Sequence, residues 1–510
     1  MKTRHASSPV TRNARGWKDL AVWTRDGYFT LQTEETGGVP VRLFLTPKLL
    51  SELEDIVYEQ IINATRFPGV RLVVMTPDAH FGYCVPVGSV ILSDVNHGAV
   101  AMGPVGFDIG CGMMSARSSV PAEIATYERR LAFNRAVMER VEMGVGGKRK
   151  RHRLGSISED EFQRLVRGGA EYYVQRYGAT FDRSRAERHR IPVDDDWRIP
   201  WGGKGTPERG IQELGSLGGG NHFIELQRCV ETGTLFVQVH TGSRGFGHGL
   251  ATNYFELARA ERPTEIKHLD LGYFLPDSPH YRAYLNAVAA GGNYAILNRL
   301  IIYEQVTEAF REVFGAELEL VYEISHNLVQ REWHPDFGDV LVHRKGATRA
   351  FPAGHPFLAG TIWEREGHPV LIPGSNMDFS YILRPLAGAV KSAYSVNHGA
   401  GRRMSRSAAS RQLSQEAINA EYRAAGIPVN IAAPVPIDEA APCYKPSEEI
   451  IAVITQAGLA RVEYTLWPLS SLKGTETRAR HRHARATQPP PAPAETPRPS
   501  RTTRRDTRHA

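Results

Sequence analysis

The sequence has few cysteines and no long apolar stretch. Its 510 residues include four cysteines, none in CxxC spacing: Cys84, Cys111, Cys229 and Cys443. So few thiols exclude a disulfide framework and indicate a reducing, cytoplasmic setting, in which a thiol stays available for a metal. No run of about 18 apolar residues occurs, so we expect no membrane span. No apolar stretch follows the basic N-terminus, so we expect no secretory signal either.

Most of the chain also lacks an excess of positive charge. The net charge is +7, but residues 475–510 hold nine arginines and three acidic residues (+6), and residues 1–18 hold five basic residues and no acidic one (+5). Residues 19–474 therefore carry −4, so nucleic acid would have to be bound there by a local site. The tail at 475–510 is rich in Arg, Pro and Thr and has no apolar period, which predicts disorder. We expect residues 1–18 to be a flexible basic segment.

Between these segments we find no internal repeat and no linker, which favours one large mixed α/β domain over 19–474. Glycine-rich loops fall mostly just after strand-like segments, where α/β proteins tend to place their chemistry. We expect strands at 71–77, 234–242 and 318–327. We expect helices at 48–64, 126–142, 159–177, 279–315 and 410–424. The Gly291-Gly292 pair predicts a break that splits the fourth of these helices in two.

The stretch GFDIGCGM, at 106–113, places a carboxylate and a thiol three residues apart among three glycines. On a strand, residues three apart face opposite sides, but glycine permits a tight turn that could aim Asp108 and Cys111 at one point. A carboxylate oxygen and a thiolate that converge indicate a divalent metal. The rest of the chain would then have to supply the other ligands.

Four histidines stand on or beside polar loops at strand ends: His222, His240, His326 and His398. Their small neighbours, Gly, Ser and Asn, leave volume for a ligand, and neutral imidazole binds transition metals. With Asp108 and Cys111, some of these histidines make a mixed oxygen, sulfur and nitrogen set that fits Mn²⁺ or Zn²⁺. One thiolate can bridge two metals, and a pair of metals about 3.5–4 Å apart suits phosphoryl transfer.

Several stretches together resemble a known family, the GTP- and manganese-dependent RtcB-type RNA ligases. The matching stretches are PDAHFGYCVPVG (77–88), GPVGFDIGCG (103–112), GSLGGGNHFIE (215–225), HTGSRGFGH (240–248), SHN (325–327), IPGS (372–375), NHGAGRRMSR (397–406), APCYK (441–445) and LKG (472–474). They span roughly residues 70–474. The resemblance implies the α/β architecture of that family, a single RtcB-type domain, and action on RNA ends in tRNA splicing or RNA repair.

The resemblance also implies a set of site residues. Asp108, Cys111 and His222 match the ligands of one manganese ion. Cys111, His240 and His326 match those of a second, with Cys111 bridging the two ions. His398 matches the histidine that becomes covalently guanylylated by GTP. The positions that match guanylate-binding residues are Asn221, Glu225, Asn327, Pro373, Gly374, Ser375, Asn376, Ser380, Gly399, Ala400, Gly401 and Lys473.

The expected activity is joining of an RNA 3′-phosphate or 2′,3′-cyclic phosphate to a 5′-hydroxyl end. His398, as neutral imidazole, would attack the α-phosphate of GTP. The guanylate would pass to the RNA 3′-phosphate, and GMP would leave when the 5′-hydroxyl attacks. Arg244 is a candidate for a phosphate contact, or else for a surface ion pair. Asp78 and His80 could orient a ligand or transfer a proton, or could cap a turn.

One loop departs from the family pattern and leaves other functions open. The usual PGSMGTAS is PGSNMDFS here, at 373–380, so Asp378 and Phe379 replace two small residues. If they line the guanylate pocket, they take volume and add negative charge, which predicts weaker GTP binding or a different substrate. Compensating changes nearby would remove that effect. The alternatives are a metal-dependent RNA-end phosphoesterase that no longer admits guanylate, and a non-catalytic protein that binds RNA through its tails.

Overall fold

A computed structural model describes residues 15–474, apart from 149, 151, 153, 179–180, 187–190, 201–206, 267 and 432–433. The predicted tail at 475–510 and most of the predicted segment at 1–18 lie outside the described residues. Trp17 is fully buried and stacks on Tyr58, with ring centroids 5.6 Å apart, so the folded body includes this residue. Within the described range, no helix is both long and apolar enough to cross a bilayer.

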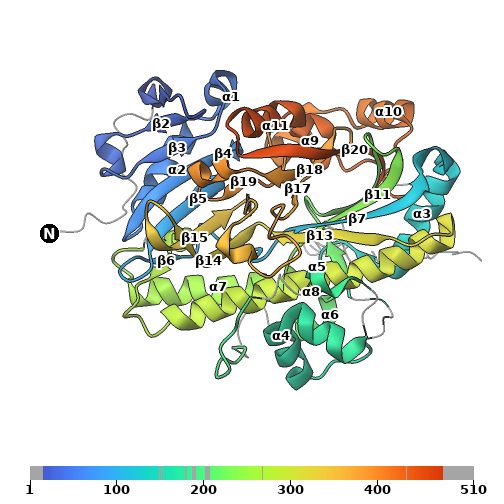
Figure 1. Cartoon of the computed structure of the whole chain (residues 1–510), viewed down its shortest axis with the longest axis horizontal. Helices are drawn as coiled ribbons and strands as arrows, with labels where there is room; N and C mark the ends of the chain where they lie inside the picture. Colours follow the sequence, from blue (N-terminus) through green and yellow to red (C-terminus); the bar gives the residue numbers. More distant parts are fainter. Residues whose placement is uncertain are drawn as a thin grey trace, which may run out of the picture.

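Two seven-stranded sheets form the centre of the fold (Figure 1). The first has the order β1 (Val22–Trp23), β2 (Phe29–Leu31), β3 (Val41–Leu43), β4 (Val70–His80), β5 (Val87–Asp94), β15 (Gly338–Lys345) and β14 (Asn327–His334). The second has the order β13 (Glu319–Ser325), β7 (Gly112–Pro121), β11 (Thr234–Thr241), β10 (Phe223–Cys229), β20 (Ala460–Lys473), β18 (Ser380–Pro385) and β17 (Val370–Ile372). Three two-stranded pairs complete the described strands: β12 (Tyr273–Phe274) with β6 (Val100–Ala101), β16 (Ala347–Arg349) with β19 (Ser395–Asn397), and β8 (Glu142–Met143) with β9 (Ser216–Gly218).

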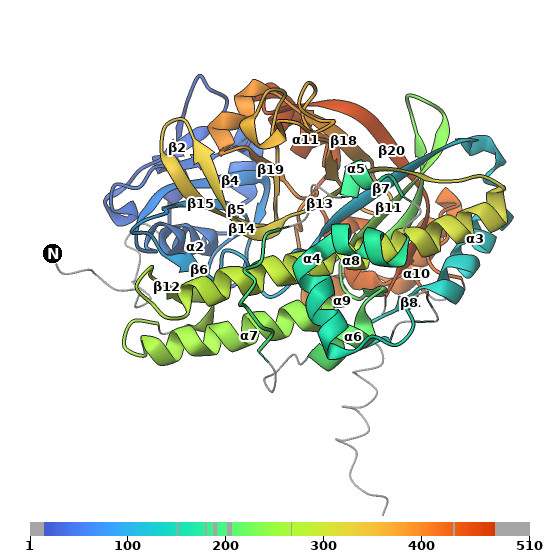
Figure 2. The ribbon, with the colours of Figure 1, turned by 60° about the horizontal axis from the view of Figure 1, so that its bottom comes forward.

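Helices surround the sheets and confirm the predicted α/β class. They are α1 (Pro47–Glu52), α2 (Ile56–Thr65), α3 (Tyr127–Arg140), α4 (Glu159–Tyr177), α5 (Arg183–Ala186), α6 (Pro207–Glu213), α7 (Arg244–Glu261), α8 (Tyr281–Phe314), α9 (Arg406–Gln412), α10 (Gln415–Ala425) and α11 (Ser447–Gln456). α7 and α8 run side by side along one side of the molecule, and α4 packs on α8 (Figures 1 and 2). α8 also packs against β7, β11 and β13, so it covers the second sheet.

The predicted break at Gly291-Gly292 is wrong, because α8 is one continuous helix of 34 residues. The two glycines instead allow the 106–111 turn to approach the helix. A Cβ on Gly291 would lie 3.0 Å from Ile109 Cγ2, and a Cβ on Gly110 would lie 2.8 Å from the Gly292 Cα. Packing of the turn against α8 therefore outweighs the roughly 1 kcal/mol by which each glycine disfavours a helix.

Two other predicted helices have different bounds. The helix expected at 48–64 is divided into α1 and α2, because Leu53 is extended (φ −62°, ψ 138°) and its side chain is buried. The helix expected at 410–424 spans the junction of α9 and α10, where the Ser414 side chain accepts a hydrogen bond from Ala417 N–H and begins a new helix. The predicted strands at 71–77, 234–242 and 318–327 are confirmed as β4, β11 and β13.

The pairing pattern brings the ends of many strands to one place. In the second sheet, β7 and β10 begin where the antiparallel strands β11 and β13 end. In the first sheet, β14 and β5 begin where β15 and β4 end. His326 is the single residue between β13 and β14, so it joins these two edges. Side chains from both sheets therefore meet at this junction.

Candidate functional site

The five predicted metal ligands come from strand ends at this junction. Cys111 immediately precedes β7, His222 immediately precedes β10, and His240 is the penultimate residue of β11. The register pairs Thr241 with Gly112 across β11 and β7. Asp108 enters from the preceding turn, in which Gly106 (φ 83°) and Gly110 (φ 73°) take left-handed conformations. Antiparallel pairing thus collects residues separated by more than 200 positions in the chain.

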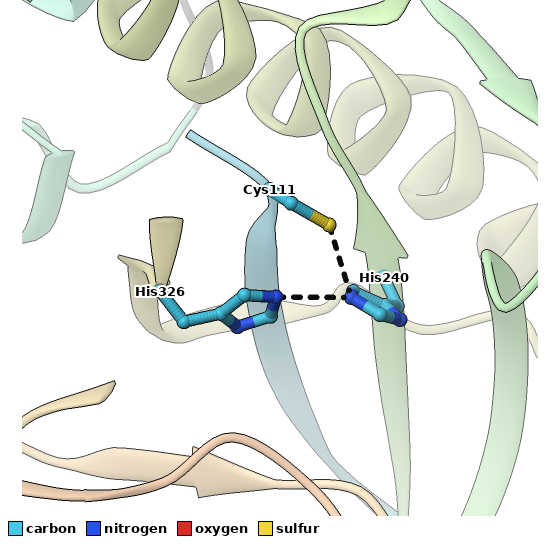
Figure 3. Close-up of side chains that lie close together, drawn as sticks. All are labelled: Cys111, His240 and His326. Atoms are coloured by element: carbon cyan, nitrogen blue, oxygen red, sulfur yellow. Dashed lines mark hydrogen bonds between the residues drawn. The ribbon is translucent and has the colours of Figure 1, made fainter. Parts of the chain in front are cut away.

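Two groups of side chains are close enough to hold a metal ion each. One group is Cys111, His240 and His326, and the other is Asp108, Cys111 and His222. In the first, Cys111 Sγ lies 3.3 Å from His240 Nε2, which lies 3.3 Å from His326 Nε2 (Figure 3). In the second, His222 Nε2 lies 3.1 Å from Asp108 Oδ2 and 3.6 Å from Cys111 Sγ. Cys111 belongs to both groups, as the resemblance implied.

The hydrogen bonds of the histidines fit metal ligation. His222 Nδ1 lies 3.0 Å from the Leu217 carbonyl and His240 Nδ1 lies 3.2 Å from the Asn221 carbonyl, so each Nδ1–H donates to a backbone oxygen. Each Nε2 then presents a lone pair toward the shared centre. His326 Nδ1 is buried and has no hydrogen-bond partner among the described residues. The Nε2 lone pairs of His222 and His240 lie beside a thiol and a carboxylate, an arrangement that a cation would stabilise.

The electrostatics of the cluster agree with this arrangement. Burial and the neighbouring histidines hold the pKa of His240 well below 6.5, and the same causes lower the pKa of His326, so both rings are neutral. Burial alone would raise the pKa of Asp108, but the adjacent His222 ring lowers this pKa. Burial and the charge of Asp108 raise the pKa of the Cys111 thiol. A bound cation would reverse this effect, because it deprotonates a coordinating thiol.

His398 lies beside this cluster and is held by Asp78. Its Nδ1 is 2.6 Å from Asp78 Oδ2, and the His398 ring centroid is 5.0 Å from that of His326. Asp78 is fully buried; burial would raise its pKa, but its contact with the His398 ring and its hydrogen bond from Thr76 lower the pKa, so the ionised carboxylate accepts the Nδ1–H. It also accepts hydrogen bonds from the backbone N–H of His398 (3.1 Å) and from the Thr76 hydroxyl (2.6 Å). Of the two interpretations of Asp78, orientation of another side chain agrees with these contacts.

A cavity of about 1220 Å³ opens onto both His398 and the cluster. It exceeds the roughly 300–1,000 Å³ of ordinary small-molecule pockets, so it has room for more than one nucleotide. Basic side chains contribute to its wall: Lys345, Arg402, Arg403, Arg406, Lys445 and Lys473. A cavity that combines a candidate metal pair, a positioned imidazole and many cations suits phosphate chemistry.

Comparison with known proteins agrees with this chemistry. The family model described as "tRNA-splicing ligase RtcB" matches residues 60–474. The chain belongs to the RtcB family. Among curated members, the tRNA-splicing ligase RtcB of Pyrobaculum aerophilum is 34% identical over 476 residues, which cover 86% of this chain and 95% of that protein. The RNA-splicing ligase RtcB of Mycobacterium tuberculosis is 36% identical over 442 residues, which cover 81% of this chain and all of that protein.

Most of the predicted guanylate-binding residues line the cavity in this RtcB family member. They are Asn221, Glu225, Asn327, Pro373, Gly374, Ser375, Asn376, Gly399, Ala400, Gly401 and Lys473. Ser380 lies outside the cavity wall; it is fully buried, and its hydroxyl accepts a hydrogen bond from Gly374 N–H (3.1 Å). Ser380 therefore supports the 373–376 loop on the side that faces away from the cavity.

Four residues of this loop, at 376–379, depart from the RtcB pattern; Asn376 lines the cavity, whereas Asp378 and Phe379 lie outside its wall. Asp378 Oδ2 accepts a hydrogen bond from Ser447 N–H (2.7 Å) at the start of α11. Phe379 packs against Trp467, with ring centroids 4.8 Å apart. Neither residue is part of the cavity wall formed by the described residues. The expected loss of pocket volume and the added negative charge thus have no structural basis.

Several contacts were not anticipated from the sequence. Tyr444 lines the cavity, and its hydroxyl donates to Glu439, a buried carboxylate that also lies 3.6 Å from Lys473 Nζ. This segment belongs to the stretch at 441–445 that resembles the RtcB family. Nothing in that stretch, however, distinguished Tyr444 from its neighbours as a functional residue. Arg244 begins α7 and extends to the Ser216 hydroxyl (3.3 Å) and the Gly144 carbonyl (3.4 Å), where its charge lowers the pKa of Asp108.

Proposed function

We propose that this protein is an RNA ligase that uses GTP to join a 3′-phosphate or 2′,3′-cyclic phosphate end to a 5′-hydroxyl end. The observation that supports this most is the position of His398, which is fixed by Asp78 beside a candidate two-metal cluster in a large cavity whose wall includes several Lys and Arg side chains. Membership in the RtcB family supports the reaction class.

His398 is the proposed nucleophile. Because its Nδ1–H donates to Asp78, its Nε2 has a free lone pair that can attack the α-phosphate of GTP. A P–N bond forms, and the bond from the α-phosphorus to the pyrophosphate oxygen breaks. Positive charge develops on the ring as the bond forms, and the buried Asp78 carboxylate stabilises it.

The proposed metals are two Mn²⁺ ions held by the two groups that share Cys111. When bound, two cations would neutralise phosphate oxygens and help to orient the pyrophosphate leaving group. The carbonyls of Leu217 and Asn221 keep His222 and His240 in the tautomer needed for ligation. Neutral histidines, one thiolate and one carboxylate agree with a borderline cation such as Mn²⁺.

The guanine base is proposed to bind near Glu225, Lys473 and Tyr444. Glu225 is buried, and its carboxyl is an acceptor for the N–H groups of guanine, which adenine does not present at the same positions. Lys473 lies directly opposite Phe223 on the neighbouring strand, with its Nζ 5.6 Å from the Phe223 ring centroid. Tyr444 lines the cavity, and its hydroxyl donates to Glu439.

Joining then requires two further transfers. An oxygen of the RNA 3′-phosphate attacks the guanylate phosphorus, and the P–N bond to His398 breaks. The 5′-hydroxyl attacks the activated 3′-phosphate, loses its proton and displaces GMP. The volume of the cavity supports this sequence, because guanylate and an RNA end must occupy it together.

The test is to incubate the purified protein with α-labelled GTP and Mn²⁺ and to look for an acid-labile, base-stable adduct. His398→Ala should form no adduct, and the wild type should join a 3′-phosphate strand to a 5′-hydroxyl strand only with GTP present. No wild-type adduct, or joining without GTP, would contradict the proposal. Asp378 and Phe379 lie outside the cavity wall, so these two side chains give no support to the phosphoesterase alternative.

A further inference from the structure

Two exposed aromatic side chains in the cavity wall have no part in the proposed guanylate transfer. Phe81 is 48% exposed, Tyr83 is 74% exposed, and both line the cavity. A single exposed apolar residue is normal on a protein surface. Two exposed rings that share one cavity with a reacting histidine indicate a surface on which a ligand packs.

The loop that bears these rings is held through its main chain. The buried Gln60 side chain, from α2, donates to the Gly82 carbonyl (2.9 Å) and accepts from the Gly82 N–H (3.0 Å). Asn63 donates to the Cys84 carbonyl (2.9 Å). These bonds fix the backbone without covering either ring. The backbone that carries the rings is therefore positioned in advance, which lowers the cost of ordering on binding.

The same loop continues directly from the residue that orients the nucleophile. Phe81 follows Asp78 by three residues, so their Cα atoms lie within about 11 Å of each other. On the other side of the loop, Lys345 Nζ is 6.0 Å from the Tyr83 ring centroid. The next residue, Gly346, is so close to His398 that a Cβ on it would lie 3.0 Å from His398 Cε1. The two aromatic rings, the Lys345 amine and the His398 imidazole thus lie close together along one part of the cavity wall.

Lys345 is an unusual cation because it is only 8% exposed. Its amine donates to the Val85 carbonyl (3.4 Å); burial lowers its pKa to about 8, and the charge of Asp270, which also lines the cavity, acts in the opposite direction. A buried amine that is still mostly protonated at pH 7 gains from a nearby anion. Phosphate is the anion that an RNA strand would bring beside a stacked base.

We propose that Phe81 and Tyr83 form a stacking platform for an unpaired nucleobase at the RNA end, with Lys345 binding the adjacent phosphate. The inference rests on the proposed ligase function, because the RNA end has to reach His398. Aromatic rings beside cations bind single-stranded nucleic acid with little sequence preference, since every base has a π face. The protein should therefore prefer ends with unpaired terminal nucleotides over blunt duplex ends.

The experiment uses two RNA probes with 2-aminopurine next to the end, one in a 3′-phosphate strand and one in a 5′-hydroxyl strand. Stacking quenches 2-aminopurine fluorescence, so the quenched probe identifies which end uses the platform. Phe81→Ala and Tyr83→Ala should each weaken binding by about fivefold to a hundredfold. Tyr83→Phe should keep the affinity, because it keeps the ring. Lys345→Gln should reduce the salt dependence of binding by about one phosphate contact.

Phe357→Ala is the matched control, because Phe357 is 54% exposed and lies outside the cavity wall of the described residues. It should change neither affinity nor quenching. Quenching in neither probe, or full quenching in a Phe81→Ala/Tyr83→Ala double variant, would overturn the platform. Adduct formation with GTP alone needs no RNA, so it tests the ligase proposal separately, and the platform variants should retain it. A wild type that quenches but forms no adduct would overturn the ligase proposal only.

Discussion

The carboxylate of Asp78 lies 2.6 Å from the imidazole of His398, although 320 positions separate them in the chain. Asp78 also accepts hydrogen bonds from the backbone N–H groups of His398 (3.1 Å) and Gly399 (3.3 Å). The orientation of the proposed nucleophile is thus set by several bonds to one buried carboxylate. The first prediction concerns this pair.

Asp78→Asn should abolish most guanylylation while leaving the fold intact. The amide oxygen can still accept from Nδ1–H and from the two backbone N–H groups, but the amide lacks the negative charge that stabilises the positively charged ring formed when His398 attacks. We expect adduct formation to slow by about 10²–10⁴-fold. The rate of label transfer from GTP measures this. Asp378→Asn is the matched control, since its carboxylate contacts α11; an Asp78→Asn rate equal to that of the control would refute the assigned role.

Single ligand substitutions should change metal stoichiometry in a fixed pattern. His222→Ala and His326→Ala should each lose one of two bound Mn²⁺ ions, because each histidine belongs to one group. Cys111→Ala should weaken both ions, by more than the roughly 10–100-fold that loss of an outer partner costs. Elemental analysis measures the number of bound Mn²⁺ ions, and calorimetry measures their affinity. His248→Ala, which lines the cavity but belongs to neither group, should retain two ions.

Binding of GTP should strengthen as pH rises toward 8 and above. Burial raises the pKa of Glu225 to about 8, so its carboxyl is mostly neutral below that pH and becomes a full acceptor above it. Guanine presents N–H donors to Glu225, so GTP should bind more tightly when the Glu225 carboxyl is ionised. Glu225→Gln should remove this pH dependence and reduce the preference for GTP over ATP by about 5–150-fold. Equilibrium binding from pH 6.5 to 9 provides the measurement; a pH-independent wild type would contradict it.

The unusual loop residues should affect stability and not nucleotide binding. Asp378→Ala removes an acceptor from the first turn of α11, which should cost about 0.5–2 kcal/mol in the free energy of unfolding. Phe379→Ala removes the contact with Trp467 and should cost up to about 3 kcal/mol. Denaturant unfolding measures both, and KM for GTP should stay unchanged. A large change in KM without loss of stability would indicate that these side chains reach the nucleotide.

Two glycines of the turn that carries Asp108 should differ sharply in their tolerance of alanine. Gly106 and Gly110 both have positive φ, but a Cβ on Gly106 meets nothing within 4 Å, whereas one on Gly110 would lie 2.8 Å from Gly292 Cα. Gly110→Ala should therefore cost about 1–3 kcal/mol more than Gly106→Ala and should also weaken Mn²⁺ binding. Thermal unfolding with metal titration compares them. Equal effects would mean that the turn does not depend on contact with α8.

The sequence was sufficient for the local features of the site and insufficient for its assembly. Glycine spacing predicted the turn that aims Asp108 and Cys111 together, and the alternation of elements predicted the α/β class. The edge at which His240, His326 and Cys111 meet depends on strand pairing across more than 100 positions, which no local pattern encodes. The resemblance to the RtcB family supplied that information instead.

The sequence-based expectations that proved wrong have a common cause, which is packing between segments far apart in the chain. Gly291-Gly292 looked like a helix break because glycine disfavours helices, yet contact with Ile109 makes small residues necessary there. Phe379 looked like an intrusion into the pocket because its partner, Trp467, lies 88 positions away. In both cases the decisive neighbour was distant in the chain. Tyr444 escaped notice for the same reason, since its link to Lys473 passes through Glu439.

A single sulfur atom, that of Cys111, belongs to both candidate metal-binding groups. Loss of this one thiol would therefore affect both groups. Oxidation or alkylation of this thiol would disable both cation positions in one event, and no second cysteine stands in either group to compensate. Burial to 4% exposure protects the sulfur from bulky reagents in the folded protein. The thiol is therefore most open to oxidation before the newly made chain has folded. Oxidants present at that stage should lower the activity of the protein that folds afterwards.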